Sequence, residues 1–328
     1  MPQDVEFALP WPLRSSPHLP RARAHSLAWL GEYGLLDGRT FTAAEFDDWK
    51  LAELAAFFFP DATGEGLELA GDLMGWYFAP FDDRFDGPLG RLPRQAAAVC
   101  EELAAVLVVN ADADAGAAPV AVRGLADIWR RSCRGMSEAW RVRAAHDWRA
   151  YLAAHLAETV DRHHGRVMGA EECVRRRALS TSSFVVIDMI ERVGGFEVPA
   201  LVWHTPVLAE LRGLTAEVIG LSNDLCSAEK EEAAGDVRNN VVLVLQRERG
   251  CGRAEAVEEV VGAITERVAR FVAVEERMAD LDCVLTEGGA ADVRRLVTGL
   301  HGLIRGDYAW ERMSGRYRAG RHRADRAR

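Results

Sequence analysis

Apolar residues recur at every third or fourth position along most of this chain, which is the period of an amphipathic helix. The clearest example lies between residues 253 and 281, where one face carries Val257, Val260, Val261, Ile264, Val268, Phe271 and Val272. The same period predicts helices over 24–36, 42–58, 66–81, 91–109, 120–136, 137–165, 171–193, 208–231, 238–248, 253–281 and 292–310. No segment shows the strict alternation of a half-buried strand, so we expect an all-α fold.

The connections between the expected helices are ordinary in length, and the sequence shows no internal repeat. We therefore expect residues 1–328 to form a single domain, an antiparallel helical bundle. We expect residues 1–23, rich in proline, to form an N-terminal arm, and 318–328 to form a mobile basic tail. Thr42, with Glu45 three residues later, predicts a capped start for the second helix. Such bundles build their sites between facing helices, from side chains that point inward.

Composition narrows the possible partners. Hydrophobic residues make up 49% of the 328 positions, enough for a sizeable core, and the net charge is −10. A negatively charged chain lacks the basic patch that nucleic acid or an anionic membrane needs, so we expect neither as a partner. An anionic substrate would therefore have to be held through metal ions.

The cysteines and the N-terminal residues indicate in which cellular compartment we expect the protein. The six cysteines are widely spread, without a C-x-x-C pair, at Cys100, Cys133, Cys173, Cys226, Cys251 and Cys283. This spacing favours reduced thiols in a cytoplasmic protein over a disulfide framework. The first 20 residues contain no apolar run that would serve as a signal peptide or membrane span.

The stretch 223–231 places an amide, a hydroxyl and a carboxylate at Asn223, Ser227 and Glu231. On a helix these side chains fall within a sector of roughly 80°, opposite an apolar stripe that runs from Leu214 to Leu225. One face therefore packs and the other presents oxygens. Oxygen ligands without histidine or thiolate suit a hard ion such as Mg²⁺. The alternative is a solvated polar face.

A second acidic cluster, Asp82-Asp83-Arg84-Phe85-Asp86, ends the third predicted helix. Asp82 and Asp86 share a face, and carboxylates at a helix C-terminus repel one another and oppose the macrodipole, by about 0.3–1 kcal/mol per contact. A divalent ion would offset this repulsion, and a surface acidic patch is the alternative. Pro80 removes one helical hydrogen bond and predicts a kink just before the cluster.

Together the two motifs resemble those of the bacterial class I terpene cyclases, a family of sesquiterpene synthases. The family's D-D-x-x-D motif matches Asp82, Asp83 and Asp86, and its N-D-x-x-S-x-x-K-E motif matches Asn223, Asp224, Ser227, Lys230 and Glu231. The arm around Phe7-Ala8-Leu9-Pro10-Trp11-Pro12 and the C-terminal Arg316-Tyr317 pair are similar too. The resemblance covers nearly the whole chain.

The resemblance implies a class I terpenoid synthase fold, in which the helices enclose a central apolar cavity. It implies that Asp82, Asn223, Ser227 and Glu231 hold three Mg²⁺ ions, with weaker support from Asp83 and Asp86. The substrate it implies is a linear isoprenoid diphosphate, first of all farnesyl diphosphate. The groups that would bind the diphosphate are Arg177, Lys230, Arg316 and Tyr317. Formation of a homodimer stays open.

Arg177 is chosen among three consecutive arginines because the family's diphosphate-sensing arginine lies 46 positions before the asparagine of the second motif. Helical rotation of about 100° per residue allows only one of the three to point squarely into a cavity. The family then breaks the helix to aim a backbone carbonyl at the reacting carbon. Here the stretch 180–183 contains no glycine, but its hydroxyl side chains permit such a break, and we assign this role to Thr181.

Aromatic side chains supply the expected cavity wall. We select Phe78, four residues before Asp82 on the same face, and Trp310, six residues before Arg316. Their rings would guide a carbocation by cation–π attraction. For the remaining aromatics near these motifs we expect ordinary core packing, and the polar run 161–164 is read as a helix end.

The expected activity is that of a lyase that ionises and cyclises an isoprenoid diphosphate. A monoterpene or diterpene cyclase is the nearest alternative. A chain-elongating prenyltransferase typically carries two aspartate-rich motifs, whereas this chain has one. A helical interaction protein with acidic surface patches is the alternative from outside enzymology.

Overall fold

The computed structural model describes residues 5–36, 38, 41–107 and 118–317, and these ranges contain helices and connecting segments but no strand. The expected all-α fold is confirmed. In chain order the α-helices are α1 (Leu19–Glu32), α2 (Ala43–Asp48), α3 (Leu51–Phe58), α4 (Gly64–Trp76), α5 (Asp83–Asp86), α6 (Pro93–Ala105), α7 (Val120–Cys133), α8 (Glu138–His164), α9 (Ala170–Ser180), α10 (Ser183–Gly194), α11 (Ala200–Trp203), α12 (Pro206–Ala233), α13 (Val241–Arg249), α14 (Arg253–Glu275) and α15 (Glu287–Met313). A π-helical turn, Tyr77–Asp82, joins α4 to α5, and 3₁₀ turns lie at Leu89–Arg91, Glu276–Val284 and Gly315–Tyr317.

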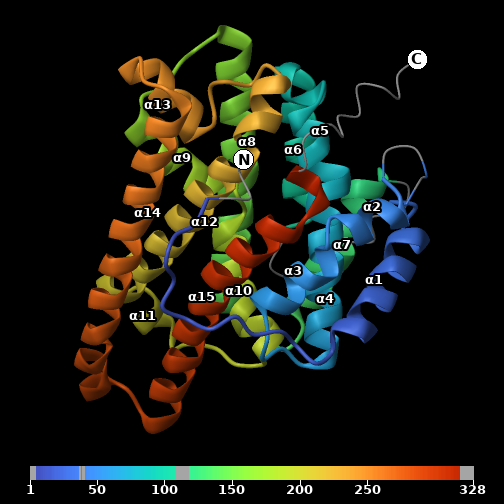
Figure 1. Cartoon of the computed structure of the whole chain (residues 1–328). Helices are drawn as coiled ribbons and strands as arrows, with labels where there is room; N and C mark the ends of the chain where they lie inside the picture. The colour runs from blue at the N-terminus through green and yellow to red at the C-terminus, as the bar shows by residue number, and fades with distance from the viewer. Residues whose placement is uncertain (1–4, 37, 39–40, 108–117, 318–328) are drawn as a thin grey trace.

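The long helices α12 and α15 run through the middle of the bundle and pack against each other (Figure 1). Helix α12 also contacts α9, α10, α13 and α14, while α15 contacts α3 and α10. The largest fully buried side chains are indoles, those of Trp76, Trp129, Trp140, Trp203 and Trp310. Each aromatic ring buries about 150–250 Å² and dominates its local packing. Of these five indoles, that of Trp310 also lines the central cavity of the bundle.

Helix α1 starts earlier in the chain than the periodicity predicts. The helix begins at Leu19 rather than at residue 24, with Pro20 in its first turn. Proline is tolerated there because the amide hydrogen it lacks would have no partner inside the helix.

The segment 42–58, expected as one helix, is two. Thr42 caps α2 as predicted, since its hydroxyl accepts a hydrogen bond from the Glu45 amide at 3.1 Å. Lys50 then adopts a left-handed conformation, with φ 58° and ψ 40°, and α3 starts at Leu51. A lysine in this conformation is not signalled by its side chain, which explains why the break was missed.

Helix α14 has the buried face that its periodicity predicts, with Val260, Ile264, Val268 and Phe271 all buried. The helix ends at Glu275, before the predicted end at residue 281, because the chain continues as the 3₁₀ turn Glu276–Val284. Helix α15 starts at Glu287, where Thr286 accepts a hydrogen bond from the Gly289 amide at 3.2 Å. The short helix α11 was not expected, since four residues carry too little periodicity.

The N-terminal arm lies along α15, where Figure 1 shows it as the blue segment that crosses the front of the bundle. Trp11 stacks on His301 with ring centroids 4.5 Å apart, and Phe7 packs on Tyr308 at the same separation. Arg312 donates to the carbonyl of Val5 at 2.7 Å. The expected basic tail, 318–328, lies outside the described residues.

None of the helices in the described ranges combines the length and the apolar character that a membrane crossing requires.

Candidate active site

A cavity of about 110 Å³ lies between α4, α9, α10, α12 and α15. It gathers nearly all the side chains that the sequence singled out, namely Phe78, Asp82, Asp86, Arg177, Thr181, Asn223, Ser227, Lys230, Glu231, Trp310, Arg316 and Tyr317. Asp83 does not line it. One end of the cavity is polar, formed by the acidic cluster, the α12 oxygens and the cationic side chains. The rest is mostly apolar and aromatic, with Leu54, Phe58, Met74, Val186 and Ile219 among its walls.

The distortion expected at Pro80 takes the form of the π-helical turn. Proline has no amide hydrogen to continue the α-helical ladder, and a wider turn accommodates this gap. The turn ends at Asp82, and α5 then carries the remaining two aspartates of the cluster. Asp82 and Asp86 line the cavity, while Asp83 forms an ion pair with Arg316 at 2.9 Å.

Helix α12 presents Asn223, Ser227 and Glu231 to the cavity, as the spacing of four residues requires. Val218, Leu221 and Leu225 are buried in the core behind them.

Asp224 has a different part. Its buried carboxylate accepts from Arg177 Nε at 2.7 Å and from the Val241 amide at 2.6 Å. Asn240 caps α13 and donates to Ser227 Oγ at 3.2 Å. These bonds set the orientation of Arg177 and Ser227 and tie α12 to α13.

Three cationic side chains bind the oxygen atoms at the polar end of the cavity. Arg316 bridges Asp82, Asp83 and Asp86, and it is almost fully buried, with 4% of its side chain exposed. Lys230 donates to Asp86 at 2.7 Å. Arg177 donates to the amide oxygen of Asn223 at 2.6 Å. The other two arginines of the run do not line the cavity and pair with Glu171, Asp161 and Glu172.

The carboxylates outnumber the charges that these cations supply. Burial and the neighbouring Asp86 raise the pKa of Asp82 to about 6, and burial raises the pKa of Glu231 to about 8. Within the described residues, no three side chains of His, Cys, Asp or Glu converge as a metal cage. The donors instead combine carboxylate, amide and hydroxyl oxygens on two facing segments, which suits hard divalent ions that keep positions for substrate oxygens. The residues present therefore fit Mg²⁺.

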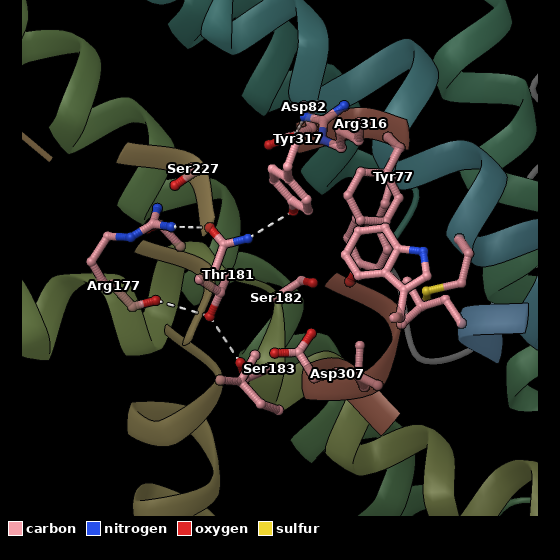
Figure 2. A pocket seen from close by; sticks show the side chains of 18 of the residues that line it. Tyr77, Asp82, Arg177, Thr181, Ser182, Ser183, Ser227, Asp307, Arg316 and Tyr317 are labelled. Carbon is pink, nitrogen blue, oxygen red and sulfur yellow. Dashed lines mark hydrogen bonds and ion pairs between the residues drawn. The ribbon is translucent and has the colours of Figure 1, made fainter. Parts of the chain in front are cut away.

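The helix break expected at 180–183 lies between α9 and α10 (Figure 2). Ser182 adopts a left-handed conformation with φ 60° and ψ 8°. Thr181 Oγ1 donates to the carbonyl of Arg177 at 3.0 Å and lies 2.8 Å from Ser183 Oγ. In the described part of the chain, no hydrogen bond reaches the carbonyl oxygen of Thr181. Hydroxyl side chains thus add hydrogen bonds at the break, where the Arg177 carbonyl accepts from both the amide and the hydroxyl of Thr181.

Phe78 and Trp310 form part of one aromatic wall, with ring centroids 5.2 Å apart. The indole of Trp310 donates to the carbonyl of Trp49 at 2.6 Å, which sets its orientation. Tyr317 packs edge-on against it and accepts a hydrogen bond from the Asn223 amide at 2.9 Å. Phe81 and Trp76, for which we expected core packing, are buried and stack on each other 5.4 Å apart.

Several lining residues were not found from the sequence. The most informative are Phe58, Tyr77, Tyr151 and Asp307. Tyr77, in the π-helical turn, and Tyr151, on α8, lie with ring centroids 5.4 Å apart, a contact between residues far apart in sequence. A local signal existed for Phe58, which lies four residues after Leu54 on one face of α3.

A family model described as "Terpene synthase family 2, C-terminal metal binding" matches residues 72–270 of this chain. The (−)-β-caryophyllene synthase of Saccharothrix espanaensis, described as cyclising (2E,6E)-farnesyl diphosphate, is 39% identical over 97% of this chain and 90% of that protein. The pentalenene synthase of Streptomyces avermitilis is 37% identical over 97% of this chain and 94% of its own length.

Among solved structures, the T181N variant of cucumene synthase superposes with a TM-score of 0.87. The two sequences are 57% identical, and the match covers 95% of this chain and 100% of the cucumene synthase chain.

Proposed function

Because this chain belongs to the terpene synthase family and is a lyase of that family, we propose that it ionises farnesyl diphosphate and cyclises the resulting carbocation to a sesquiterpene. The observation that carries the proposal is the division of one cavity into two ends. Oxygen donors from α5 and α12 converge with three cationic side chains at the polar end. Mostly apolar and aromatic side chains enclose the remainder, together with the hydroxyl run 180–183 and Asp307.

We assign the diphosphate to the polar end. Asp82, Asn223, Ser227 and Glu231 would hold three Mg²⁺ ions, supported by Asp83 and Asp86. When bound, these ions supply Lewis-acid stabilisation of the charge that develops on the leaving diphosphate.

Each cationic side chain then has a role in ionisation. Arg177, Lys230 and Arg316 would donate hydrogen bonds to the diphosphate oxygens, with Tyr317 as a further donor. Such charge-assisted bonds stabilise the leaving group most as its negative charge grows. In the absence of substrate the same side chains bind the carboxylates and the asparagine of the site.

The carbon chain belongs to the apolar end. Phe78 and Trp310 present ring faces that attract a cation, and the buried walls exclude water that would quench it. The carbonyl of Thr181 would supply a negative dipole at the helix break, because no backbone amide in the described ranges uses it. These groups hold the cation in a reactive conformation, so they govern which rings form.

The test is to incubate the purified protein with Mg²⁺ and geranyl, farnesyl or geranylgeranyl diphosphate separately. Released diphosphate and the extracted hydrocarbons are both measured, the latter by gas chromatography and mass spectrometry. A cyclic fifteen-carbon product from farnesyl diphosphate supports the proposal, and a ten- or twenty-carbon product changes the chain length. A longer linear diphosphate, made when isopentenyl diphosphate is added, would identify a prenyltransferase instead.

The proposal extends to location and assembly. We propose a cytoplasmic enzyme whose 328 residues form one domain, with a small-molecule diphosphate as partner and neither nucleic acid nor a membrane. Light scattering after size exclusion distinguishes a monomer from a homodimer.

A further inference from the structure

One buried carboxyl group of the cavity has no part in the roles assigned above. Asp307 lies on α15, three residues before Trp310, and only 5% of it is exposed. It lines the cavity, and its Oδ2 atom is buried without a hydrogen-bond partner among the described residues. In Figure 2 its carboxyl group points toward Ser182 and Ser183, at the bottom of the view, while Asp82 and Arg316 lie at the top.

The surroundings of Asp307 differ from those of the acidic cluster. Asp82, Asp83 and Asp86 are paired with Arg316, and Asp86 also with Lys230. No ion pair reaches Asp307 in the described part of the chain, where burial and the neighbouring carboxyl of Glu311 raise its pKa well above the ordinary value. An unpaired charge is costly in an apolar environment, whereas a neutral carboxylic acid is not. Burial without a cationic partner therefore favours the neutral acid form of Asp307 in the free enzyme.

Glu311, one turn further along α15, does not share this situation. Its carboxylate accepts hydrogen bonds from Ser222 and Asn223, on the side of α15 that faces α12. Asp307 alone of the two lines the cavity. The side chain that meets the carbon skeleton is thus an acidic O–H group without an acceptor of its own.

We propose that Asp307 is a catalytic residue that protonates a neutral alkene intermediate in the cavity and later takes a proton back. The inference rests on the proposed function. A first cyclic cation loses a proton to the diphosphate leaving group and becomes a neutral alkene. The O–H bond of Asp307 then breaks, its proton bonds to one alkene carbon using the π electrons, and the other alkene carbon becomes cationic.

The final step reverses the charge separation. A C–H bond next to the cation breaks, its electron pair forms the product double bond, and the proton returns to the Asp307 carboxylate. No proton is gained or lost by the enzyme over the cycle. A carboxylate and a carbocation attract each other strongly in a dry cavity, so each stabilises the other between the two steps.

Solvent deuterium tests this inference, because a carboxylic acid exchanges its proton with D₂O before substrate binds. The Mg²⁺-loaded enzyme is incubated with farnesyl diphosphate in D₂O, and the product is analysed by mass spectrometry and NMR. We expect one carbon-bound deuterium in the wild-type product. The isosteric variant Asp307→Asn should release diphosphate within a few-fold of the wild-type rate, yet yield an unlabelled hydrocarbon with fewer rings.

Asp292→Asn is the matched control, since it makes the same chemical change on α15 at a residue that pairs with Arg295 on the surface. It should keep the wild-type product and label. An unlabelled wild-type product, or an Asp307→Asn product with unchanged rings and deuterium, overturns the inference while the lyase activity stands. A wild-type chain that releases no diphosphate from any of the three substrates overturns the proposed function and the inference with it.

Infrared difference spectra of the substrate-free proteins provide a second readout that does not depend on how the variant folds with substrate. Wild type minus Asp307→Asn should contain the carbonyl band of a protonated carboxylic acid, shifted in D₂O. A carboxylate band in its place contradicts the inference.

Discussion

Ser182 shows how one residue can interrupt a helix without glycine. Its left-handed backbone separates α9 from α10, between Thr181 and Ser183, which both line the cavity. Left-handed geometry costs an ordinary residue roughly 1–2 kcal/mol, so the surrounding contacts must hold it. The strain lies within the site that we assign to catalysis, which is where such strain tends to occur.

Replacement of Ser182 by glycine should therefore stabilise the protein. Glycine adopts the left-handed conformation freely but has more freedom to lose on folding, so we expect a net gain of about 0.5–1 kcal/mol in the free energy of unfolding. Urea denaturation measures it. Ser183→Gly is the matched control, because Ser183 has helical geometry and should lose stability. Equal effects of the two substitutions would contradict the account of strain.

Asn223 tests the metal site at the scale of a single atom. Its amide oxygen is one of the proposed Mg²⁺ ligands, so Asn223→Ala should lower kcat/KM by about 10²-fold or more and raise the Mg²⁺ concentration needed for activity. Steady-state kinetics over a Mg²⁺ titration measure both. Gln246→Ala removes a half-buried amide that pairs with Arg253 outside the cavity and should change neither quantity. Near-normal kinetics for the alanine variant at 223 would exclude this ligand.

At the scale of elements, the site depends on how closely α15 approaches α3. A Cβ atom on Gly306 would lie 2.9 Å from the backbone carbon of Phe57, and one on Gly302 would lie 3.1 Å from the carbonyl oxygen of Phe58. The two glycines are one turn apart, so they form a flat strip along α15 on which α3 rests. This contact positions Phe58 and Asp307 on adjoining walls of the cavity.

Gly306→Ala should separate the two helices. Overpacking of this kind costs about 1–3 kcal/mol, and the displaced wall should also change the product distribution. Thermal unfolding and product analysis measure the two effects. Gly288→Ala on the same helix has no atom within 4 Å of the added Cβ, so it should leave stability almost unchanged. A stable Gly306→Ala variant with wild-type products would show that the close approach is not needed.

The contact between α1 and α4 should depend on pH. His25 Nε2 lies 3.1 Å from the buried carboxylate of Asp72, and this hydrogen bond raises the pKa of His25 above 6.5. The protonated histidine binds best, so its stabilisation is complete below the unfolded pKa and is lost as pH rises through the folded pKa. His25→Gln should thus lower the melting temperature near pH 6 and have little effect near pH 9. A pH-independent difference from wild type would exclude this linkage.

At the scale of the whole molecule, the end of the described chain closes the cavity that the bundle surrounds. The turn Gly315–Tyr317 brings Arg316 onto the acidic cluster, with its guanidinium 4.9 Å from the Phe78 ring and 4.8 Å from the Trp49 ring. The N-terminal arm lies along α15, where Val5 and Glu6 bind Arg312. Both ends of the described chain therefore converge on α15.

This convergence predicts that Arg316 couples diphosphate binding to closure. Mg²⁺ and pyrophosphate added together should increase hydrogen-exchange protection of residues 310–317. Arg316→Gln should abolish this gain and weaken pyrophosphate binding about 10–100-fold, since it removes charge-assisted hydrogen bonds. Titration calorimetry measures the affinity. Arg312→Gln, which loses contacts to the arm and to Tyr308 but none to the acidic cluster, should bind normally, and equal losses in both variants would refute the assignment.

Local physics determined much of this protein in advance. The helical period predicted most of the helices, because burial of one face is a property of each segment alone. Spacing by four residues placed Asn223, Ser227 and Glu231 on one face of α12, and it did the same for Asp82 and Asp86, since helix geometry admits no other outcome. Pro80 signalled a distorted turn for an equally local reason, its missing amide hydrogen.

Tertiary structure decided everything that joins distant segments. Arg316 meets Asp83 across 233 positions, and Asn223 meets Tyr317 across 94. Lys50 and Ser182 have left-handed backbones that their residue types disfavour. No side chain signals the break at Lys50, whereas the hydroxyl run 180–183 signals only that a break is permitted there. Asp307 is the most consequential residue of this kind, because its neighbours in the sequence predict only a polar residue on a helix. Its burial, its lack of a partner and its orientation into the cavity arise only when α15 packs against α3, α10 and α12, because long-range contacts set the environment in which a carboxyl group keeps its proton.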